Sequence, residues 1–288
     1  MANLKDIRNR ISSVKSIQQV TRAMKMVAAA KIRKAQERME QARPYANRLK
    51  DEILTLLPDV DRSLLELLDV RDVKRTAYVV ITSDRGLAGS FNTNIIKCAE
   101  EEIKKIGKEK VDLFCIGRRG YEHFKHHQYN IIEEHTDFWA DLDFNHSVKI
   151  GNGIISHFTA KNVDKIRVVF NQFKNIMVQE ITSERLLPLT LDEDVEIEIK
   201  DRLYEPSKEI IVKSLIPLHL NIQMWRYLLE SYASEQAARM VAMESATENA
   251  GDLIRGLTRK FNNARQAVIT KEILEIVGGA EALKHQRG

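Results

Sequence analysis

Two pairs of glycines in the middle of the sequence have a spacing that could bind phosphate. Gly86 and Gly89 lie in SDRGLAGSFN, and Gly117 and Gly120 lie in CIGRRGY. Each pair follows an apolar run and precedes a helix-forming segment, where backbone amides can hold a phosphate group. The spacing is only G-x-x-G, which lacks the third glycine of a dinucleotide site and the lysine of a P-loop. We therefore favour tight turns, which use the freedom of glycine at positive φ, and keep nucleotide binding as the alternative.

No other group of residues is a better candidate for chemistry. His123, His126 and His127 crowd one predicted helix, but no cysteine pair and no HExxH spacing joins them. A solvated polar face is therefore a better interpretation than a metal site. No serine has a matched histidine and aspartate, and no pair of carboxylates has helical spacing in an apolar setting. We expect a non-catalytic chain that binds no metal and no cofactor.

The cysteines and the apolar runs indicate the cellular setting. Cys98 and Cys115 are too few for a disulfide framework, and Cys115 lies in an apolar run, so we expect reduced thiols in a cytosolic protein. No apolar stretch approaches the roughly 20 residues that span a bilayer, and the N-terminus lacks the apolar core of a signal peptide. Any association with a membrane is expected to be indirect.

Charge is distributed unevenly along the chain. Residues 1–50 carry 13 basic and 3 acidic residues, and residues 255–288 carry 7 and 3, whereas residues 51–254 carry 25 and 35. Basic ends suit an anionic partner, which can be nucleic acid, lipid or an acidic protein surface. Aromatic residues make up only 6% of the chain, too few for a stacking platform along a single strand, and no nucleic-acid module is recognisable. We expect no nucleic-acid partner.

A heptad pattern predicts one long helix over about residues 4–57. A spacing of four and then three residues holds from Ile7 to Leu56, interrupted only at Gln18, Thr21 and Lys25. At 1.5 Å per residue such a helix is about 80 Å long. Pro44 predicts a kink or a local break near its position. Beside the interruption, a neighbouring apolar stripe has the same spacing and suggests a second surface: Ile17, Val20, Met24 and Val27.

The middle of the chain has a different sequence pattern, in which apolar runs rich in β-forming residues alternate with segments typical of helices. We predict strands at 76–82, 111–116 and 166–170, and helices at 94–106, 121–127 and 148–159. Such alternation indicates βαβ units and a mostly parallel sheet covered by helices. Residues 178–182 and 195–199 are predicted as edge strands.

A second long helix is predicted after Pro217, over residues 218–277, ending at Gly278 and Gly279. Its apolar positions are large at first and small later: Leu218, Ile222, Trp225, Leu229, Tyr232, and then Ala233, Ala237, Ala242, Ala246, Ala250. Two long helices that flank one α/β domain can bury their apolar stripes against each other. We therefore predict an α/β protein with a long antiparallel α-helical coiled coil of the N- and C-terminal segments and a central Rossmann-like domain. The expected segments are 1–57 and 207–288 for the coil and 76–200 for the α/β domain.

Several stretches resemble the gamma subunit of the bacterial-type rotary ATP synthase. They are IRNRISSVKSIQQVTRAMKMVAAAKIRKAQ, SDRGLAGSFN, LLPL, LYEP, ASEQAARMVAMESATENAGDLI and NNARQAVITKEILEIVGGAEAL. The similarity covers nearly the whole chain and is greatest at both ends.

The resemblance implies a central rotor shaft inside a ring of alternating alpha and beta subunits. Its α/β domain would rest on the membrane-embedded c ring, beside the epsilon subunit. The proton-driven ring would turn the shaft, whose asymmetry drives the beta subunits through their states, so ATP synthesis is coupled to proton transport while catalysis stays on beta. The implied location is the cytoplasmic face of a bacterial plasma membrane, reached only through the complex, and the missing transit peptide favours a bacterial origin.

The resemblance also suggests which residues meet the partners. Facing the beta subunits would be Met24, Lys25, Met26, Arg265, Gln266, Thr270 and Glu272. Tyr204 and Glu205 would lie near the c ring and epsilon. Between Ala267 and Val277 apolar residues point nearly all the way around the helix, which requires burial on all sides. Together with the resemblance, this predicts that Ile269, Ile273 and Ile276 contact an apolar sleeve of the alpha-beta ring.

Overall fold

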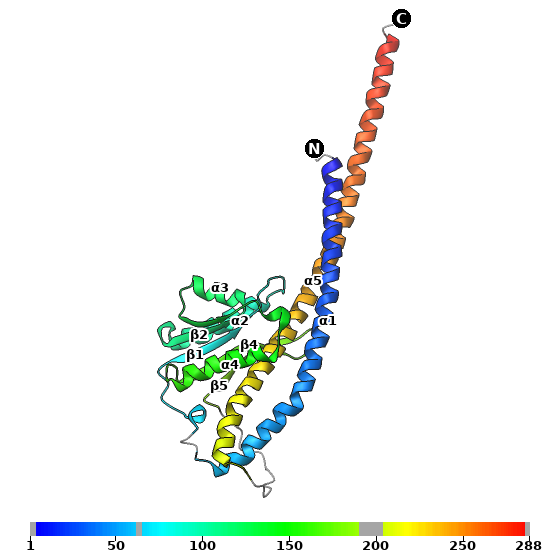
Figure 1. Ribbon diagram of the computed structural model, residues 1–288. Coiled ribbons are helices and arrows are strands. Elements are labelled where there is room, and N and C mark those ends of the chain that lie inside the picture. Colours follow the sequence, from blue (N-terminus) through cyan, green and yellow to red (C-terminus); the bar gives the residue numbers. More distant parts are fainter. Residues whose placement is uncertain (1–3, 62–64, 190–203, 286–288) are drawn as a thin grey trace. The chain divides into compact units, whose positions relative to one another are not determined.

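The computed structural model describes residues 4–61, 65–189 and 204–285 (Figure 1). It divides into two compact units, each described here by itself. The larger unit comprises residues 28–240, and the smaller unit comprises residues 1–27 together with residues 241–288. Two long helices contribute to both units: α1, Leu4–Leu56, and α5, Lys208–His285.

A five-stranded mixed sheet forms the centre of the larger unit. Its strands are β1 (Thr76–Ile81), β2 (Val111–Ile116), β3 (Ile131–His135), β4 (Lys165–Phe173) and β5 (Gln179–Leu187). They lie in the order β3-β2-β1-β4-β5, in which only β5 is antiparallel to its neighbour. All six residues of β1 and of β2 are buried, as expected for continuous apolar runs in a parallel sheet with helices on both faces.

Helices cover both faces of this sheet and make two cores. On one face, α2 (Phe91–Ile106) and α3 (Arg118–His126) contribute to a core around Tyr78 and Phe124. On the other face, α4 (Phe144–Thr159) packs with the long helices into a larger core. Gly151 permits a close approach of α4 to α5, because a Cβ there would lie 2.0 Å from Asn221 Oδ1. Short 3₁₀ turns are η1 (Leu57–Asp59), η3 (Glu66–Leu68), η4 (Lys108–Lys110) and η5 (Trp139–Asp141).

The heptad pattern predicts correctly which side of α1 faces α5 in the larger unit. Buried positions on α1 follow the predicted spacing: Ala28, Ile32, Ala35, Leu49, Ile53 and Leu56. The end of α1 and the start of α5 contribute to one core, which contains Ile53, Leu56, Val212 and Ile216, and Figure 1 shows the two helices running antiparallel in this unit. The prediction of long packed helices around a central α/β sheet is confirmed.

Of the kink or local break predicted at Pro44 the break is absent, and both predicted ends of the second long helix, Leu218 and Val277, are wrong. The helix α1 continues through Pro44 without a break, and Figure 1 shows a curve in the light-blue part of α1 that contains this residue. Pro44 and Glu40, whose carbonyl loses its helical partner, are both exposed, so water can take that hydrogen bond. The helix α5 likewise begins ten residues before Leu218, at Lys208, includes Pro217, and continues past Gly278 to His285. Glycine permits a helix end without imposing one.

In the smaller unit, polar contacts join the two helices. Thr21 Oγ1 and Thr247 Oγ1 are 2.7 Å apart, and Lys25 forms an ion pair with Glu244. Arg8 lies over the ring of Phe261, 5.6 Å from its centroid, so the helices are antiparallel here too. The helix contact does not move to the neighbouring apolar stripe, of which Ile17, Val20 and Val27 are more than half exposed.

In the middle of the chain the predicted strands and helices are present with small shifts of their ends. Of the predicted edge strand 178–182, residues 179–182 belong to β5, at one edge of the sheet. The strand β3 was not predicted, since its sequence IIEEH has no apolar run, and residues 195–199 lie outside the described residues. No helix in the described part of the chain is long and apolar enough to cross a membrane. The division into segments 1–57, 76–200 and 207–288 stays a prediction.

Candidate interaction surfaces

The second glycine pair has a packing reason. A Cβ on Gly117 would lie 2.1 Å from the carbonyl oxygen of Thr82, and one on Gly120 would lie 2.9 Å from Thr82 Oγ1. The Gly120 amide donates a hydrogen bond to that hydroxyl at 2.9 Å. These glycines let the start of α3 approach the residue after β1 closely, so no ligand is needed to explain them.

The first glycine pair lies in a turn whose nearby amides are already bonded. Gly89 has φ +57°, which glycine adopts readily. Asp84, in the same turn, accepts at Oδ1 from the Arg118 amide at the start of α3, which follows the second glycine pair, at 2.9 Å. The Ser83 amide donates to Asn92 Oδ1 at 2.9 Å. A carboxylate of the protein thus takes the place of an anion at the start of α3, which favours the turn over the nucleotide alternative at that position.

The histidines and cysteines do not converge on a reactive site. His123 lies 2.9 Å from Glu100 and stacks on His127 at 4.3 Å between ring centroids. Among the described residues, no three histidine, cysteine or acidic side chains are placed to hold a metal ion. Burial raises the pKa of Cys115 to about 12, and burial is also the main cause of the raised pKa of Cys98. Both thiols are therefore protonated near neutral pH, which is the less reactive form.

The proposed beta-facing residues of α1 border a groove in the smaller unit. This groove has a volume of about 450 Å³ and is lined by Gln18, Gln19, Arg22, Lys25, Met26, Glu244, Thr247 and Glu248. Met26 is 63% exposed, whereas Met24 is half-buried and Lys25 is paired with Glu244. The structure thus brings Lys25 and Met26 together on one surface.

The proposed contact residues of α5 are exposed. Arg265, Gln266, Thr270 and Glu272 all face solvent in the described structure, and Thr270 Oγ1 donates to the Gln266 carbonyl at 2.9 Å. Ile269, Ile273 and Ile276 are 46%, 55% and 71% exposed. The helix α1 does not cover this part of α5, which leaves an apolar surface without a partner in the described chain.

Tyr204 and Glu205 lie just before α5 begins. The Tyr204 ring is half-buried with Lys208 Nζ 5.2 Å from its centroid, and Glu205 is exposed. Glu205 is therefore accessible to another molecule, and Tyr204 is partly so.

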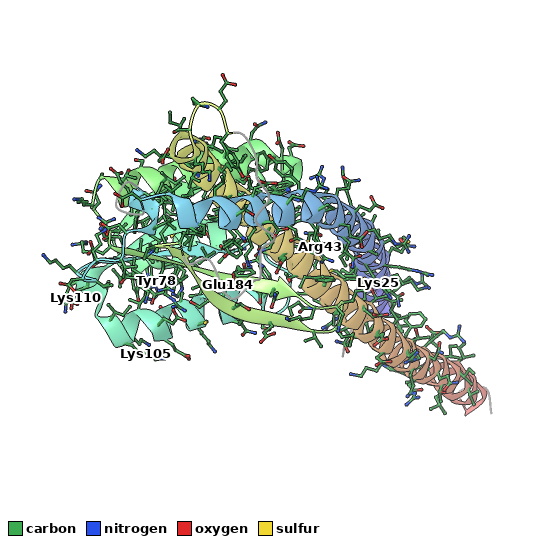
Figure 2. The ribbon with its side chains drawn as sticks, turned by 90° about the horizontal axis from the view of Figure 1, so that it is seen from below. Lys25, Arg43, Tyr78, Lys105, Lys110 and Glu184 are labelled. Carbon is green, nitrogen blue, oxygen red and sulfur yellow. The ribbon has the colours of Figure 1, made fainter. Side chains whose placement is uncertain are left out.

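Polar residues inside the larger unit were not predicted from the sequence. Glu184 on β5, labelled in Figure 2, accepts hydrogen bonds from Arg226 at 2.7 Å and from the Tyr227 hydroxyl at 2.8 Å. Burial, followed by the positive charges of Lys50 and Arg226, lowers the pKa of His219 to about 4. The sequence signal for a polar interior was a set of polar residues in the part of α5 that is buried in the larger unit: His219, Asn221, Ser231, Ser234, Glu235, Gln236 and Arg239.

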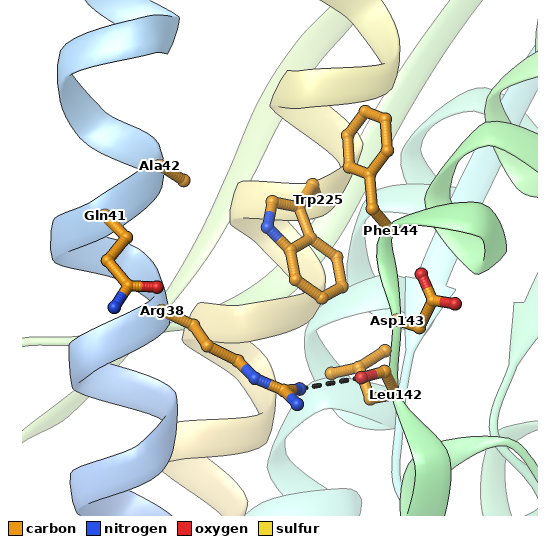
Figure 3. A pocket seen from close by; sticks show the side chains of 7 residues that line it. All are labelled: Arg38, Gln41, Ala42, Leu142, Asp143, Phe144 and Trp225. Atoms are coloured by element: carbon orange, nitrogen blue, oxygen red, sulfur yellow. Dashed lines mark hydrogen bonds between the residues drawn. The ribbon is translucent and has the colours of Figure 1, made fainter.

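A second groove lies in the larger unit, between α1, α5 and the start of α4 (Figure 3). Its volume is about 460 Å³, and its lining residues are Arg38, Gln41, Ala42, Leu142, Asp143, Phe144 and Trp225. Arg38 Nη1 donates to the Leu142 carbonyl at 2.7 Å. Arg38 and Leu142 are 104 positions apart in the sequence, so no local pattern predicts this contact.

Comparison with known proteins decides the family. A family model described as ATP synthase matches residues 3–283. The "ATP synthase gamma chain" of Prosthecochloris aestuarii is 50% identical over 292 residues, covering 99% of each chain. The chain belongs to the ATP synthase gamma family. As a gamma chain it is the central rotor stalk of an F-type ATP synthase, a non-catalytic subunit of a complex that couples ATP synthesis to proton transport.

Solved structures agree with the gamma-chain fold. A chain from the Euglena gracilis mitochondrial ATP synthase, in a structure of OSCP, F1 and c-ring, aligns with a TM-score of 0.70 at 20% identity, covering 99% of this chain and 96% of that chain. A chain from the central stalk and c-ring structure of the Tetrahymena thermophila enzyme has a TM-score of 0.60 at 24% identity, covering 79% and 99%. At these identities the likeness shows the fold alone.

Proposed function

We propose that this gamma chain transmits rotation of a proton-driven c ring to the catalytic beta subunits of an alpha-beta hexamer. The observation that carries the proposal is the uncovered apolar surface of α5 around Ile273 and Ile276, more than half of each side chain being exposed. Exposed apolar patches of this kind mark contacts with other proteins. An apolar sleeve of the alpha-beta ring is the expected cover.

Besides this sleeve contact, two further sets of residues are expected to meet the beta subunits in turn. On α5 they are Arg265, Gln266, Thr270 and Glu272, and on α1 they are Met24, Lys25 and Met26. The exposure of Met26 and of the four α5 residues supports this assignment. Hydrogen bonds to exposed polar side chains can form and break as the shaft turns, which suits contacts with successive subunits.

The residues just before α5 are expected to meet the rotor partners. Tyr204 and Glu205 would face the c ring and the epsilon subunit, and the α/β segment 76–200 would form the foot between the helical segments. The protein would lie at the cytoplasmic face of the bacterial plasma membrane as a peripheral subunit, held there only by the complex. No nucleic acid takes part in this function.

Co-purification tests the proposal directly. A tagged chain expressed with its own alpha, beta, epsilon and c subunits should recover all four, and membrane extraction of the complex should remove the chain from the membrane. The purified chain alone should not hydrolyse ATP. A chain that fails to recover alpha and beta, or that binds DNA with a steep dependence on salt concentration, would overturn the assignment.

A further inference from the structure

The loop between β3 and α4, residues 136–143, contacts both long helices of the larger unit. Its Leu142 carbonyl accepts the 2.7 Å hydrogen bond from Arg38 of α1 (Figure 3). Its Trp139 ring stacks on Tyr232 of α5, with centroids 6.0 Å apart and planes within 4°. Trp139 and Leu142 are nearly fully buried, at 7% and 3% exposed. One short segment therefore joins α1 to α5.

The same loop is fixed to the sheet side of the unit. The Asp137 amide donates to Asp84 Oδ2 at 2.9 Å, and Arg118 forms an ion pair with the Asp137 carboxylate. At its other end, Asp143 caps α4 by accepting from the Asn145 amide at 2.8 Å. Hydrogen bonds at Asp137 and at Asp143 hold the loop 136–143 in one position. A force that the long helices exert on this loop is therefore transmitted to the sheet.

A rotor stalk needs such a link. Residues 57–75 connect α1 to β1, and residues 188–207 connect β5 to α5, so each covalent connection is close to twenty residues long. The sheet and the long helices also share one apolar core, which includes Val79 of β1, Ile53 of α1 and Leu220 of α5. The twisting load must therefore pass through side-chain contacts between the sheet and the helices.

We propose that Arg38 and Trp139 are positioning residues that lock the α/β sheet to the helix pair and carry the twisting load between them. The guanidinium suits this role because it is always charged and its hydrogen bond to the carbonyl of the buried Leu142 is directional. The stacked Trp139 and Tyr232 rings resist sliding through their large contact area. This inference adds residues for rotation itself and does not depend on which partner touches the sheet.

The torsional stiffness of the shaft tests the proposal. The alpha-beta hexamer assembled with this chain is fixed to a surface, and a probe on Lys110→Cys, which is exposed, follows the angle of the sheet during pauses. Arg38→Met should increase the variance of that angle, because thermal fluctuation grows as the link softens. Arg38→Lys, which keeps one donor, should reverse part of the increase. The matched control Arg48→Met changes an exposed arginine of the same helix and should keep the wild-type variance.

Two further results separate this role from simple folding stability. If Arg38→Met does not assemble, Trp139→Phe keeps an aromatic ring at the contact and should still raise the variance. Assembled Arg38→Met or Trp139→Phe complexes with wild-type variance would overturn the proposal, even if the variants unfold at a lower temperature. A chain that does not assemble with the hexamer in any form would instead contradict the proposed function.

Discussion

The same pair of helices is held together in two different ways. In the larger unit the contact is apolar, with Ile53, Leu220 and Leu228 at most 2% exposed. In the smaller unit a threonine pair and an ion pair join the helices, while Ile17 and Val20 point outward. A heptad pattern therefore tells which side of a helix meets its partner, but residue types at those positions tell how strongly the two are held.

The largest effect should come from a deletion in the apolar contact. Ile53→Ala removes a side chain that is fully buried in the larger unit, so it should lower the free energy of unfolding by about 2–5 kcal/mol. Ile11→Ala, at an equivalent heptad position in the smaller unit, removes a half-buried side chain and should cost less than half as much. Both tryptophans, Trp139 and Trp225, lie in the larger unit. Tryptophan fluorescence therefore reports the unfolding of the larger unit. The urea concentration at the midpoint of this unfolding should fall for Ile53→Ala and stay unchanged for Ile11→Ala. Equal shifts would contradict the comparison.

This contrast also separates what the sequence predicts from what it does not. Spacing alone locates Ala28, Ile32 and Ile53 on the buried side of α1, because helical periodicity is a local property. Apolar runs likewise locate β1 and β2. The strand β3 was missed because at a sheet edge its polar residues can face solvent. The link between Arg38 and Leu142 joins residues that are 104 positions apart, and no local pattern encodes such a distance.

Acid should destabilise the apolar contact through His219. Burial lowers the pKa of His219 to about 4, below its ordinary value of 6.5, so the folded state favours the neutral ring. The neutral His219 ring contributes fully to the free energy of unfolding above pH 6.5. This contribution is lost as pH falls toward 4, because the unfolded state binds the proton at a higher pH than the folded state does. The loss is about 3 kcal/mol, since each pH unit between the two values corresponds to about 1.4 kcal/mol.

Urea unfolding at a series of pH values between 7 and 4 measures this loss. His219→Leu should remove that part of the pH dependence, whereas His126→Gln, which changes an exposed histidine of α3, should keep it. A His219→Leu profile parallel to the wild type would show that other groups cause the acid sensitivity.

The exposed apolar end of the smaller unit should matter for assembly and not for the fold. Ile273→Ser and Ile276→Ser should each weaken assembly with the alpha-beta hexamer by about 1.5–3 kcal/mol if the sleeve buries them fully. Gln266→Ala with Thr270→Ala should leave the yield of complex intact and change the rate of ATP turnover. Yield and turnover are measured for both pairs. If the isoleucine pair and the Gln266 and Thr270 pair change yield and turnover equally, the proposed difference between an apolar sleeve contact and a polar contact with the beta subunits is wrong.

The smallest effect concerns the threonine pair and tests whether polar contacts hold the smaller unit together. Thr21 is 8% exposed, and its hydroxyl lies 2.7 Å from that of Thr247, which also donates to the Met243 carbonyl at 2.7 Å. Thr21→Val and Thr247→Val should each destabilise this unit by about 0.5–1.5 kcal/mol, because each removes the hydrogen bond between the two hydroxyls. The double variant should cost less than the sum of the two, since two methyl groups can then face each other. Amide hydrogen exchange over residues 15–27 and 241–255, which reports local opening, measures all three variants. A double variant that equals the sum would mean that the hydroxyls do not interact, and the smaller unit would then depend on its half-buried apolar residues, as the larger unit depends on its buried ones.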